Sequence, residues 1–99
     1  MMTIHLFKTI NGISVVGKIK ADYVDSYQIL DPVLLEEEDG ILKAVPCNIV
    51  HFSNDKYSIN LDKFKVLYVL NQDFIAPEII RLYQDFFKQS TQKEISSTP

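Results

Sequence analysis

The stretch that decides the fold is INGISVVGKIKADYVDSYQILDPVLL, residues 10–35. Between Ile13 and Tyr23, odd positions hold apolar residues or glycine and even positions hold polar ones, with Val16 as the exception. Such alternation is typical of a strand with one buried and one solvated face. Gly17 lies on the buried parity without a side chain to pack, so it indicates a bend or a close approach of another backbone. The pattern therefore predicts the long, curved strand of a small barrel.

Turn signals on both sides of this strand predict its neighbours. Asn11-Gly12 favours a two-residue type I′ turn, which would fold residues 3–8 back onto the long strand as a hairpin. Asp25-Ser26 precedes a third predicted strand at 27–36, in which Pro32 indicates a bulge, a bend or an edge. The acidic run EEEDG at 36–40 predicts a solvated hairpin tip rather than a cation site, because its acids lack the spacing of a cation-binding loop.

The second half of the chain predicts further strands and a helix. A fourth strand is expected at 41–52, interrupted by Pro46, and a short extended piece at 57–61. Residues 64–70 are apolar on both parities, so this strand would lie at the barrel centre, under a helix or in an intersubunit seam. Cap-type residues and helical spacing of apolar residues predict a helix at about 73–89.

Length and composition indicate one domain that can fold without a disulfide or a metal ion. The domain is expected to cover residues 1–89, and residues 90–99, which are polar and lack periodicity, predict a disordered tail. Cys47 is the single cysteine of the chain, so no intrachain disulfide can form, which suits a reducing cytosol. No leader or membrane-spanning run is recognised, so a soluble protein with no membrane partner is expected.

The charge and apolar content bear on partners. The net charge of −3 does not attract a phosphate backbone over a broad surface, so a nucleic-acid site would have to be local. Hydrophobic residues make up 46% of the chain, which is compatible with apolar surface left for a subunit interface or with a merely well-filled core.

The residues that could carry catalysis or bind a metal are few and scattered. Cys47 and His51 share one face of a predicted strand, but four residues of extended chain separate them by roughly 13 Å, too far for a catalytic pair. His5 stands alone near the N-terminus, and the three glycines are spread over separate elements rather than gathered in a phosphate-binding loop. The sequence therefore favours a protein that is not an enzyme and has no metal or cofactor.

One motif resembles a known family. The spacing Gly12-x4-Gly17-x-Ile19, followed by an acidic residue at Asp22, resembles the first motif of Sm-like proteins, Gly-x4-Gly-x-Leu-x3-Asp. The resemblance covers about two thirds of the chain and is closest to small Sm-like proteins carried by bacteriophages. It implies a mainly β fold: a small, strongly bent, five-stranded Sm-like (SH3-type) barrel, here with a C-terminal α-helix. For a phage-encoded chain it implies a location in the host cytoplasm.

The resemblance also implies an assembly. Sm-like proteins form rings by pairing the fourth strand of one subunit with the fifth strand of the next, and a closed ring pairs edges that would otherwise aggregate. A homo-oligomeric ring of about five to seven subunits is expected here. The corresponding strands are 41–52 and 64–70, and the expected interface residues are Ile49, Val50, Phe52, Leu67 and Val69.

Two functions remain open for such a ring. The first is weak binding of single-stranded RNA, with tyrosines that stack bases beside lysines; the expected site residues are Ser26, Tyr27, Tyr57, Lys63 and Lys65. The second is a protein-interaction or scaffold ring without RNA. The second is favoured by the acidic balance and by Asp62-Lys63, which stands where the family has an Arg-Gly pair that helps to bind uridine.

Overall fold

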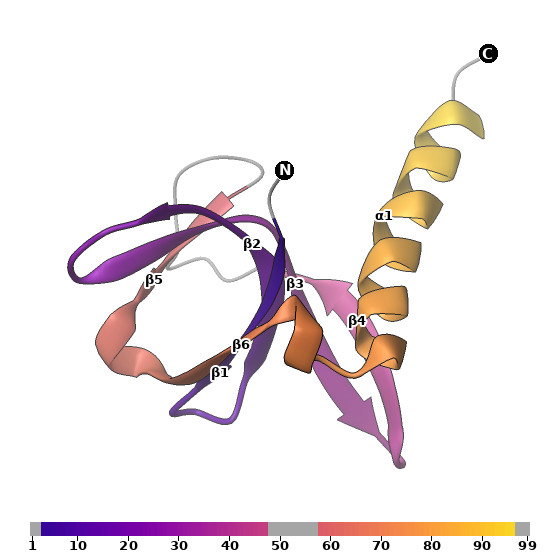
Figure 1. Ribbon diagram of the computed structural model, residues 1–99. Coiled ribbons are helices and arrows are strands. Elements are labelled where there is room, and N and C mark those ends of the chain that lie inside the picture. The colour runs from indigo at the N-terminus through magenta and orange to yellow at the C-terminus, as the bar shows by residue number, and fades with distance from the viewer. Residues whose placement is uncertain (1–2, 48–57, 97–99) are drawn as a thin grey trace.

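A single antiparallel sheet, bent on itself and flanked by one long helix, forms the described part of the chain (Figure 1). The computed structural model describes residues 3–47 and 58–96, with side chains as far as residue 88. The strands are β1 (Ile4–Thr9), β2 (Ser14–Asp22), β3 (Ser26–Glu38), β4 (Ile41–Pro46), β5 (Ser58–Asp62) and β6 (Val66–Asn71). Two 3₁₀ turns, η1 (Lys63–Lys65) and η2 (Gln72–Phe74), precede β6 and the helix α1 (Pro77–Ser96).

Strand β3 is the bent element that gives the sheet its barrel-like shape. Its first half pairs with β5 and its second half pairs with β4, so the strand order β4-β3-β2-β1-β6 carries β5 as a branch on β3. Its pairing with β2 shifts register between Leu30 and Val33, which places Asp31 and Pro32 opposite Gly17. Asp31 has a φ of 50°, the left-handed value found in bulges. The bend or bulge predicted at Pro32 is confirmed.

Gly17 is where two strands come too close for a side chain. A Cβ built at this position would lie 2.4 Å from Cγ2 of Ile29 and 3.1 Å from the carbonyl oxygen of Leu30. Both distances are shorter than ordinary van der Waals contact between these atoms. The predicted close approach at this glycine is confirmed, and it coincides with the bulge of β3.

The sheet separates two hydrophobic cores. The barrel core lies inside the curved sheet and contains Phe7, Val15, Ile29, Ile59 and Leu61. The helix core lies between the other face and α1, and contains Ile4, Leu6, Val16, Val33, Ile75 and Tyr83. Val16, which breaks the alternation in the sequence, is fully buried in the helix core, because the face predicted to be solvated is covered by the helix.

Tyr83 ties the helix to the bend in β3. Its ring is buried, and its hydroxyl donates a 2.8 Å hydrogen bond to the carbonyl oxygen of Asp31. Burial raises the pKa of Tyr83, because the charged phenolate would be desolvated, and the nearby carboxylate of Asp31 acts in the same direction. The hydrogen bond gives a partner to a carbonyl at the bulge, where the regular ladder is interrupted.

The turns differ from the prediction at one place. The predicted two-residue type I′ turn at Asn11-Gly12 is wrong, because the connection between β1 and β2 spans residues 10–13. The backbone N–H of Gly12 donates to the Thr9 carbonyl, and of Asn11 and Gly12 only Gly12 has a positive φ. Asp39 and Gly40, by contrast, both have positive φ and join Glu38 directly to Ile41. The predicted hairpin tip is therefore confirmed there, with the geometry of a type I′ turn.

The C-terminal elements also depart from the prediction. The helix begins at Pro77 rather than near 73, because residues 72–74 form η2, and it continues to Ser96, through most of the segment predicted to be a disordered tail. The strand predicted at 64–70 begins at Val66, since residues 63–65 form η1. Among the described strands it lies at an edge rather than at the centre. Val66, Val69 and Leu70 pack against the two cores, whereas the exposed Leu67 and Tyr68 are not explained within one chain.

Over the described residues the sheet has six strands, where five were predicted. The predicted fourth strand is represented by β4, which ends at Pro46, and the predicted extended piece is a full strand, β5, paired to the other half of β3. Residues 48–52 of the predicted strand lie outside the described residues. The mainly β class, the strong bend and the C-terminal helix are confirmed.

Candidate functional site

The structure brings three of the predicted RNA-binding residues to one end of the barrel. Tyr27 and Ser26 open β3, and Asp22 at the end of β2 is the cross-strand neighbour of Tyr27. Lys63 in η1 is held against this corner, because its backbone N–H donates to the carbonyl of Asp25 at 2.9 Å. We call this group, Asp22, Tyr27 and Lys63, the Tyr27 cluster.

Within the Tyr27 cluster, each group already has a partner. The ammonium of Lys63 lies 2.5 Å from Oδ1 of Asp22 and 4.8 Å from the centroid of the Tyr27 ring. The hydrogen bond to Asp22 raises the pKa of Lys63. The Tyr27 ring also packs at 5.4 Å from Phe7 in the barrel core. Lys63 and Phe7 thus both contact the ring on which an RNA base would have to stack.

The remaining predicted RNA-binding residues do not add an attractive surface for phosphate. Lys65 lies 3.7 Å from a carboxylate oxygen of Asp62. Of the described residues, the corner carries two ammonium groups, Lys63 and Lys65, and three carboxylates, Asp22, Asp25 and Asp62, so two positive and three negative charges leave a local charge of −1. Tyr57 lies outside the described residues. This local charge does not favour a polyanion.

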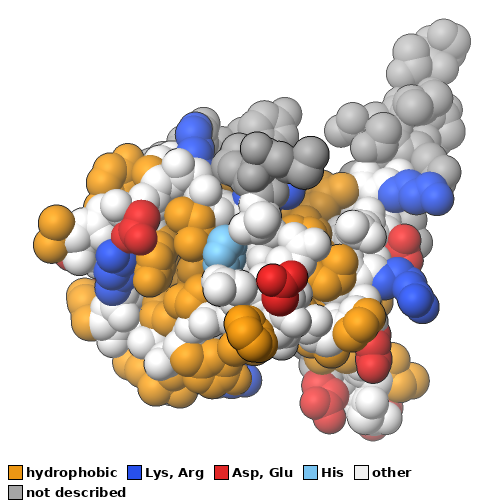
Figure 2. Space-filling view, in the orientation of Figure 1, with side chains coloured by type: hydrophobic (Ala, Val, Ile, Leu, Met, Phe, Trp, Pro, Cys, Tyr) orange, Lys and Arg blue, Asp and Glu red, His pale blue; other side chains and the backbone are white. Residues whose placement is uncertain are grey.

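A second candidate site is the pair of open edges at the two ends of the sheet. In the described part of the chain, β6 pairs with β1 and with no other strand, and both β4 and β5 pair with β3 alone. Beside the β6 edge, large apolar side chains face solvent: Phe64 is 76% exposed, Leu67 61% and Tyr68 49%. Figure 2 shows hydrophobic side chains gathered over much of the barrel's surface.

The predicted interface residues are placed unequally. Leu67 is exposed beside the open β6 edge, whereas Val69 is half-buried and packs against the barrel core around Phe7. Ile49, Val50 and Phe52 lie outside the described residues. Phe64, the first residue of the strand predicted at 64–70, was not among the predicted interface residues, although its position between two lysines could have indicated a side chain without a place in the core.

Catalytic geometry is not found among the described residues. Cys47 is half-buried, and His51 lies outside the described part of the chain. His5 lies on β1 with Nδ1 3.2 Å from the carbonyl oxygen of Thr3. Over residues 3–47 and 58–88 no three His, Cys, Asp or Glu side chains are placed to bind a metal ion.

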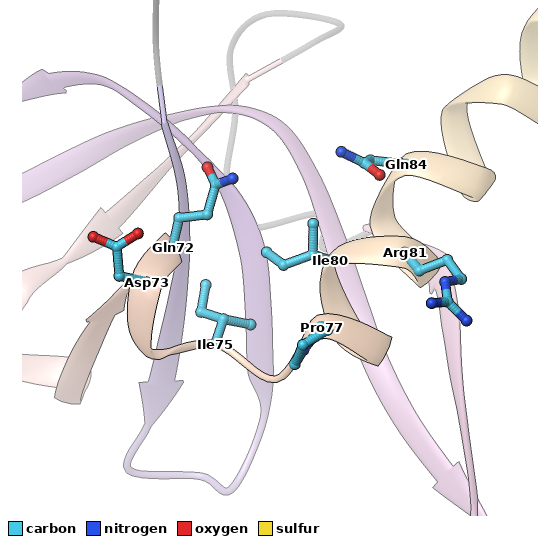
Figure 3. Close-up of a pocket in the computed structure, with 7 residues that line it drawn as sticks. All are labelled: Gln72, Asp73, Ile75, Pro77, Ile80, Arg81 and Gln84. Carbon is cyan, nitrogen blue, oxygen red and sulfur yellow. The ribbon is translucent and has the colours of Figure 1, made fainter.

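The residues that the structure describes line two hollows on the helix side. One, of about 440 Å³, lies beside the first turns of α1 (Figure 3), where Asp73 and Arg81 sit at opposite ends rather than converging. Its Gln72 side chain is used structurally, because Oε1 accepts a hydrogen bond from the backbone N–H of Ile4. The other, of about 400 Å³, lies on the sheet below the start of α1.

No protein-family model matches the sequence, and no curated protein matches it. As for membranes, none of the helices within the described ranges is long and apolar enough to cross a bilayer.

Proposed function

We propose that this chain is a non-catalytic, Sm-like module that assembles into a homo-oligomeric ring and acts as a scaffold for other macromolecules. In this assembly the β6 edge of one subunit pairs with the β4–β5 edge of the next. The proposal rests on two observations from residues 3–47 and 58–96: both ends of the bent sheet are open edges, and apolar side chains are exposed at one of them.

The two edges are different surfaces, which favours a ring over a two-fold dimer. A contact that joins unlike surfaces is heterologous, and it repeats until the rotation closes the assembly. An apolar edge strand that stays unpaired is also an aggregation hazard, which closure removes. The Sm-like motif at Gly12 and Gly17 supports the same arrangement, since that family assembles in this way.

The exposed side chains can supply useful binding energy. A phenylalanine can bury roughly 200 Å², so the 76% exposure of Phe64 corresponds to about 150 Å². At about 25 cal/mol per Å², covering it would contribute roughly 4 kcal/mol before the cost of association is subtracted. Leu67 and the backbone hydrogen bonds of an added strand would increase this gain.

Of the two functions considered for the ring, the contacts of the Tyr27 cluster support a scaffold without RNA binding. The expected RNA-binding lysines are paired with Asp22 and Asp62, and the Tyr27 ring is in contact with Lys63 and Phe7. A gel-shift panel of oligo-U, oligo-A and mixed RNA at physiological salt tests this version. We expect no complex, and a complex that weakens in Lys63→Ala/Lys65→Ala, but not in Lys20→Ala, would instead assign RNA binding to this corner.

The ring itself is tested by mass. We expect light scattering coupled to size-exclusion chromatography to give a single species of about five to seven times the 11.4 kDa chain mass. Leu67→Asp should dissociate it, because a carboxylate would be buried at the seam without a partner. Val24→Asp is the matched control, since Val24 is 97% exposed in the turn between β2 and β3 and belongs to none of the edge strands β4, β5 and β6.

The outcomes separate the alternatives. A monomeric wild-type protein at micromolar concentration would reject the ring, and so would a Leu67→Asp variant of unchanged mass. A stable dimer would point to a contact between identical edges instead. Circular dichroism of Leu67→Asp must show a folded β protein, so that loss of mass is assigned to the seam.

A further inference from the structure

The bulge at Asp31 and Pro32 divides β3 into two halves that pair with different strands. Residues 26–30 pair with β5 and residues 33–38 pair with β4, whereas Asp31 and Pro32 belong to neither ladder. The pairing of β3 with β2 shifts register across the same two residues. A bulge bends its strand and increases the local twist, so the backbone at Asp31 sets where β4 lies relative to β5.

Helix α1 packs on the second half of β3. Val33 belongs to the helix core, and Leu35 packs against it together with Ala44 of β4. In the first half, by contrast, Ile29 belongs to the barrel core and Tyr27 packs against it. Figure 1 accordingly shows α1 beside β4, while β5 lies away from the helix. Because the helix contacts the second half, a displacement of α1 would move that half relative to the first.

Tyr83 attaches α1 to the point where the two halves of β3 meet. Its hydroxyl donates to the carbonyl oxygen of Asp31 at 2.8 Å, and its buried ring lies edge-on to Phe87 at 5.0 Å. From β2, Nζ of Lys18 lies 3.9 Å from Oδ2 of Asp31, and both of these side chains are about one third exposed. The hydrogen bond of the buried tyrosine is shorter and less screened by water, so it constrains Asp31 more strongly than the ion pair does.

We propose that α1, through the hydrogen bond from Tyr83 to Asp31, holds the bend of β3 and so sets the angle between the β4 and β5 edges. Its effect on assembly rests on the ring proposed above, in which these two edges together receive β6 of the next subunit. The rotation between neighbouring subunits is roughly 72°, 60° and 51° for rings of five, six and seven. These rotations differ by only about ten degrees, so a bend held less firmly would admit more than one subunit number.

The bend is measured within one full-length chain by electron–electron double resonance. Spin labels at Lys43→Cys in β4 and Asn60→Cys in β5, two exposed positions, report the distance between these strands in a Cys47→Ser background. An excess of unlabelled protein suppresses distances between chains. A change of about ten degrees moves the end of a strand of about 20 Å by roughly 3 Å. We therefore expect Tyr83→Phe to shift the mean distance by at least about 3 Å or to double the width of its distribution.

Two further variants separate the hydrogen bond from a general loss of stability. Ile80→Ala removes apolar packing from the same helix and leaves Tyr83 bonded to Asp31. Replacement of Tyr83 by 4-aminophenylalanine keeps the ring and a donor for the same carbonyl. We expect both to retain the distance distribution of the labelled background. Native mass spectrometry of the unlabelled proteins should give one subunit number for the wild type and for both of these variants, and at least two for Tyr83→Phe.

The outcomes distinguish the bend from the ring. A shifted or broadened distance in Tyr83→Phe alone supports control of the bend by α1, whether the protein is a ring or a monomer. An unchanged distance in Tyr83→Phe, an equal change in Ile80→Ala, or no rescue by 4-aminophenylalanine would overturn it. A changed distance with one unchanged subunit number would overturn the effect on assembly. A monomeric wild-type protein would reject the ring itself, and the distance measurement would still decide the control of the bend.

Discussion

Substitution of Gly17 by alanine tests the physical account of the bend. The added Cβ would lie 2.4 Å from Cγ2 of Ile29, a fully buried side chain whose branched Cβ leaves it little freedom to rotate. The Leu30 carbonyl oxygen at 3.1 Å blocks a shift in its own direction. Overpacking of this kind lowers the free energy of unfolding by about 1–3 kcal/mol. The better strand propensity of alanine compared with glycine offsets about a few tenths of a kcal/mol of that loss.

We therefore expect Gly17→Ala to lower the free energy of unfolding by about 2 kcal/mol, which is roughly 8–16 °C in the thermal midpoint for a domain of this size. Urea titration followed by circular dichroism, at one fixed protein concentration, measures the difference. Gly12→Ala is the contrasting variant: its Cβ would meet nothing within 4 Å, so only the φ of 82° opposes it, at a cost of about 1–2 kcal/mol.

A double-mutant cycle separates the clash from other effects. Ile29→Leu removes the offending Cγ2 branch, so alanine at position 17 should cost less in that background than in the wild type, by about 1 kcal/mol. No such rescue is expected for Gly12→Ala combined with Ile29→Leu. If Gly17→Ala is as stable as the wild type, or if its cost is the same in both backgrounds, the close approach of the two strands does not constrain the fold.

Three further predictions concern the bulge and the seam. Tyr83→Phe should cost about 1–2 kcal/mol at neutral pH, since the Asp31 carbonyl loses its buried donor. Because folding raises the pKa of Tyr83, its contribution to the free energy of unfolding is complete below the unfolded pKa of about 10 and is lost as the pH rises above that value. Between pH 8 and pH 10.5 the urea midpoint should therefore fall further for the wild type than for Tyr83→Phe. Asp31→Ala should be less stable than Asp31→Gly by about 1 kcal/mol in urea titration, because glycine accepts the φ of 50° more readily, and equal stabilities would contradict this. Val69→Lys should give unfolded or insoluble protein rather than a folded monomer, since Val69 packs on the barrel core and a lysine there would be buried unpaired, which near-UV circular dichroism and sedimentation can check.

The parts of the fold that follow from short-range pattern could be predicted from the sequence. Alternation along residues 13–23 indicated β2, Gly17 indicated the close approach, and Asp39-Gly40 indicated a hairpin tip. Each of these depends on the chemistry of one or two residues and their immediate neighbours. The helix was predicted too, but not its bounds, because the 3₁₀ turn at 72–74 uses residues that read equally well as helix caps.

The parts that depend on tertiary context could not be predicted. Val16 is an exception to the alternation of apolar and polar residues, because the local pattern does not show that α1 covers the second face of the sheet. The left-handed conformation of Asp31 arises from its position opposite Gly17, and the partner of its carbonyl, Tyr83, is 52 residues away. Pairing of Lys63 with Asp22 likewise needs the fold, so the sequence left RNA binding open at Lys63 and Lys65, which the structure pairs with Asp22 and Asp62.

The pairing of β1 with β6 has a consequence for how the chain folds. The meander of β1, β2, β3 and β4 joins neighbours in sequence, whereas His5 meets Asn71 across nearly the whole barrel sequence. Loop-closure entropy makes such a distant pairing late and comparatively slow. By this argument we expect β6 to join the sheet late. In the described part of the chain β6 is also the strand with an unpaired apolar edge, so self-assembly and final closure of the sheet would compete for the same strand.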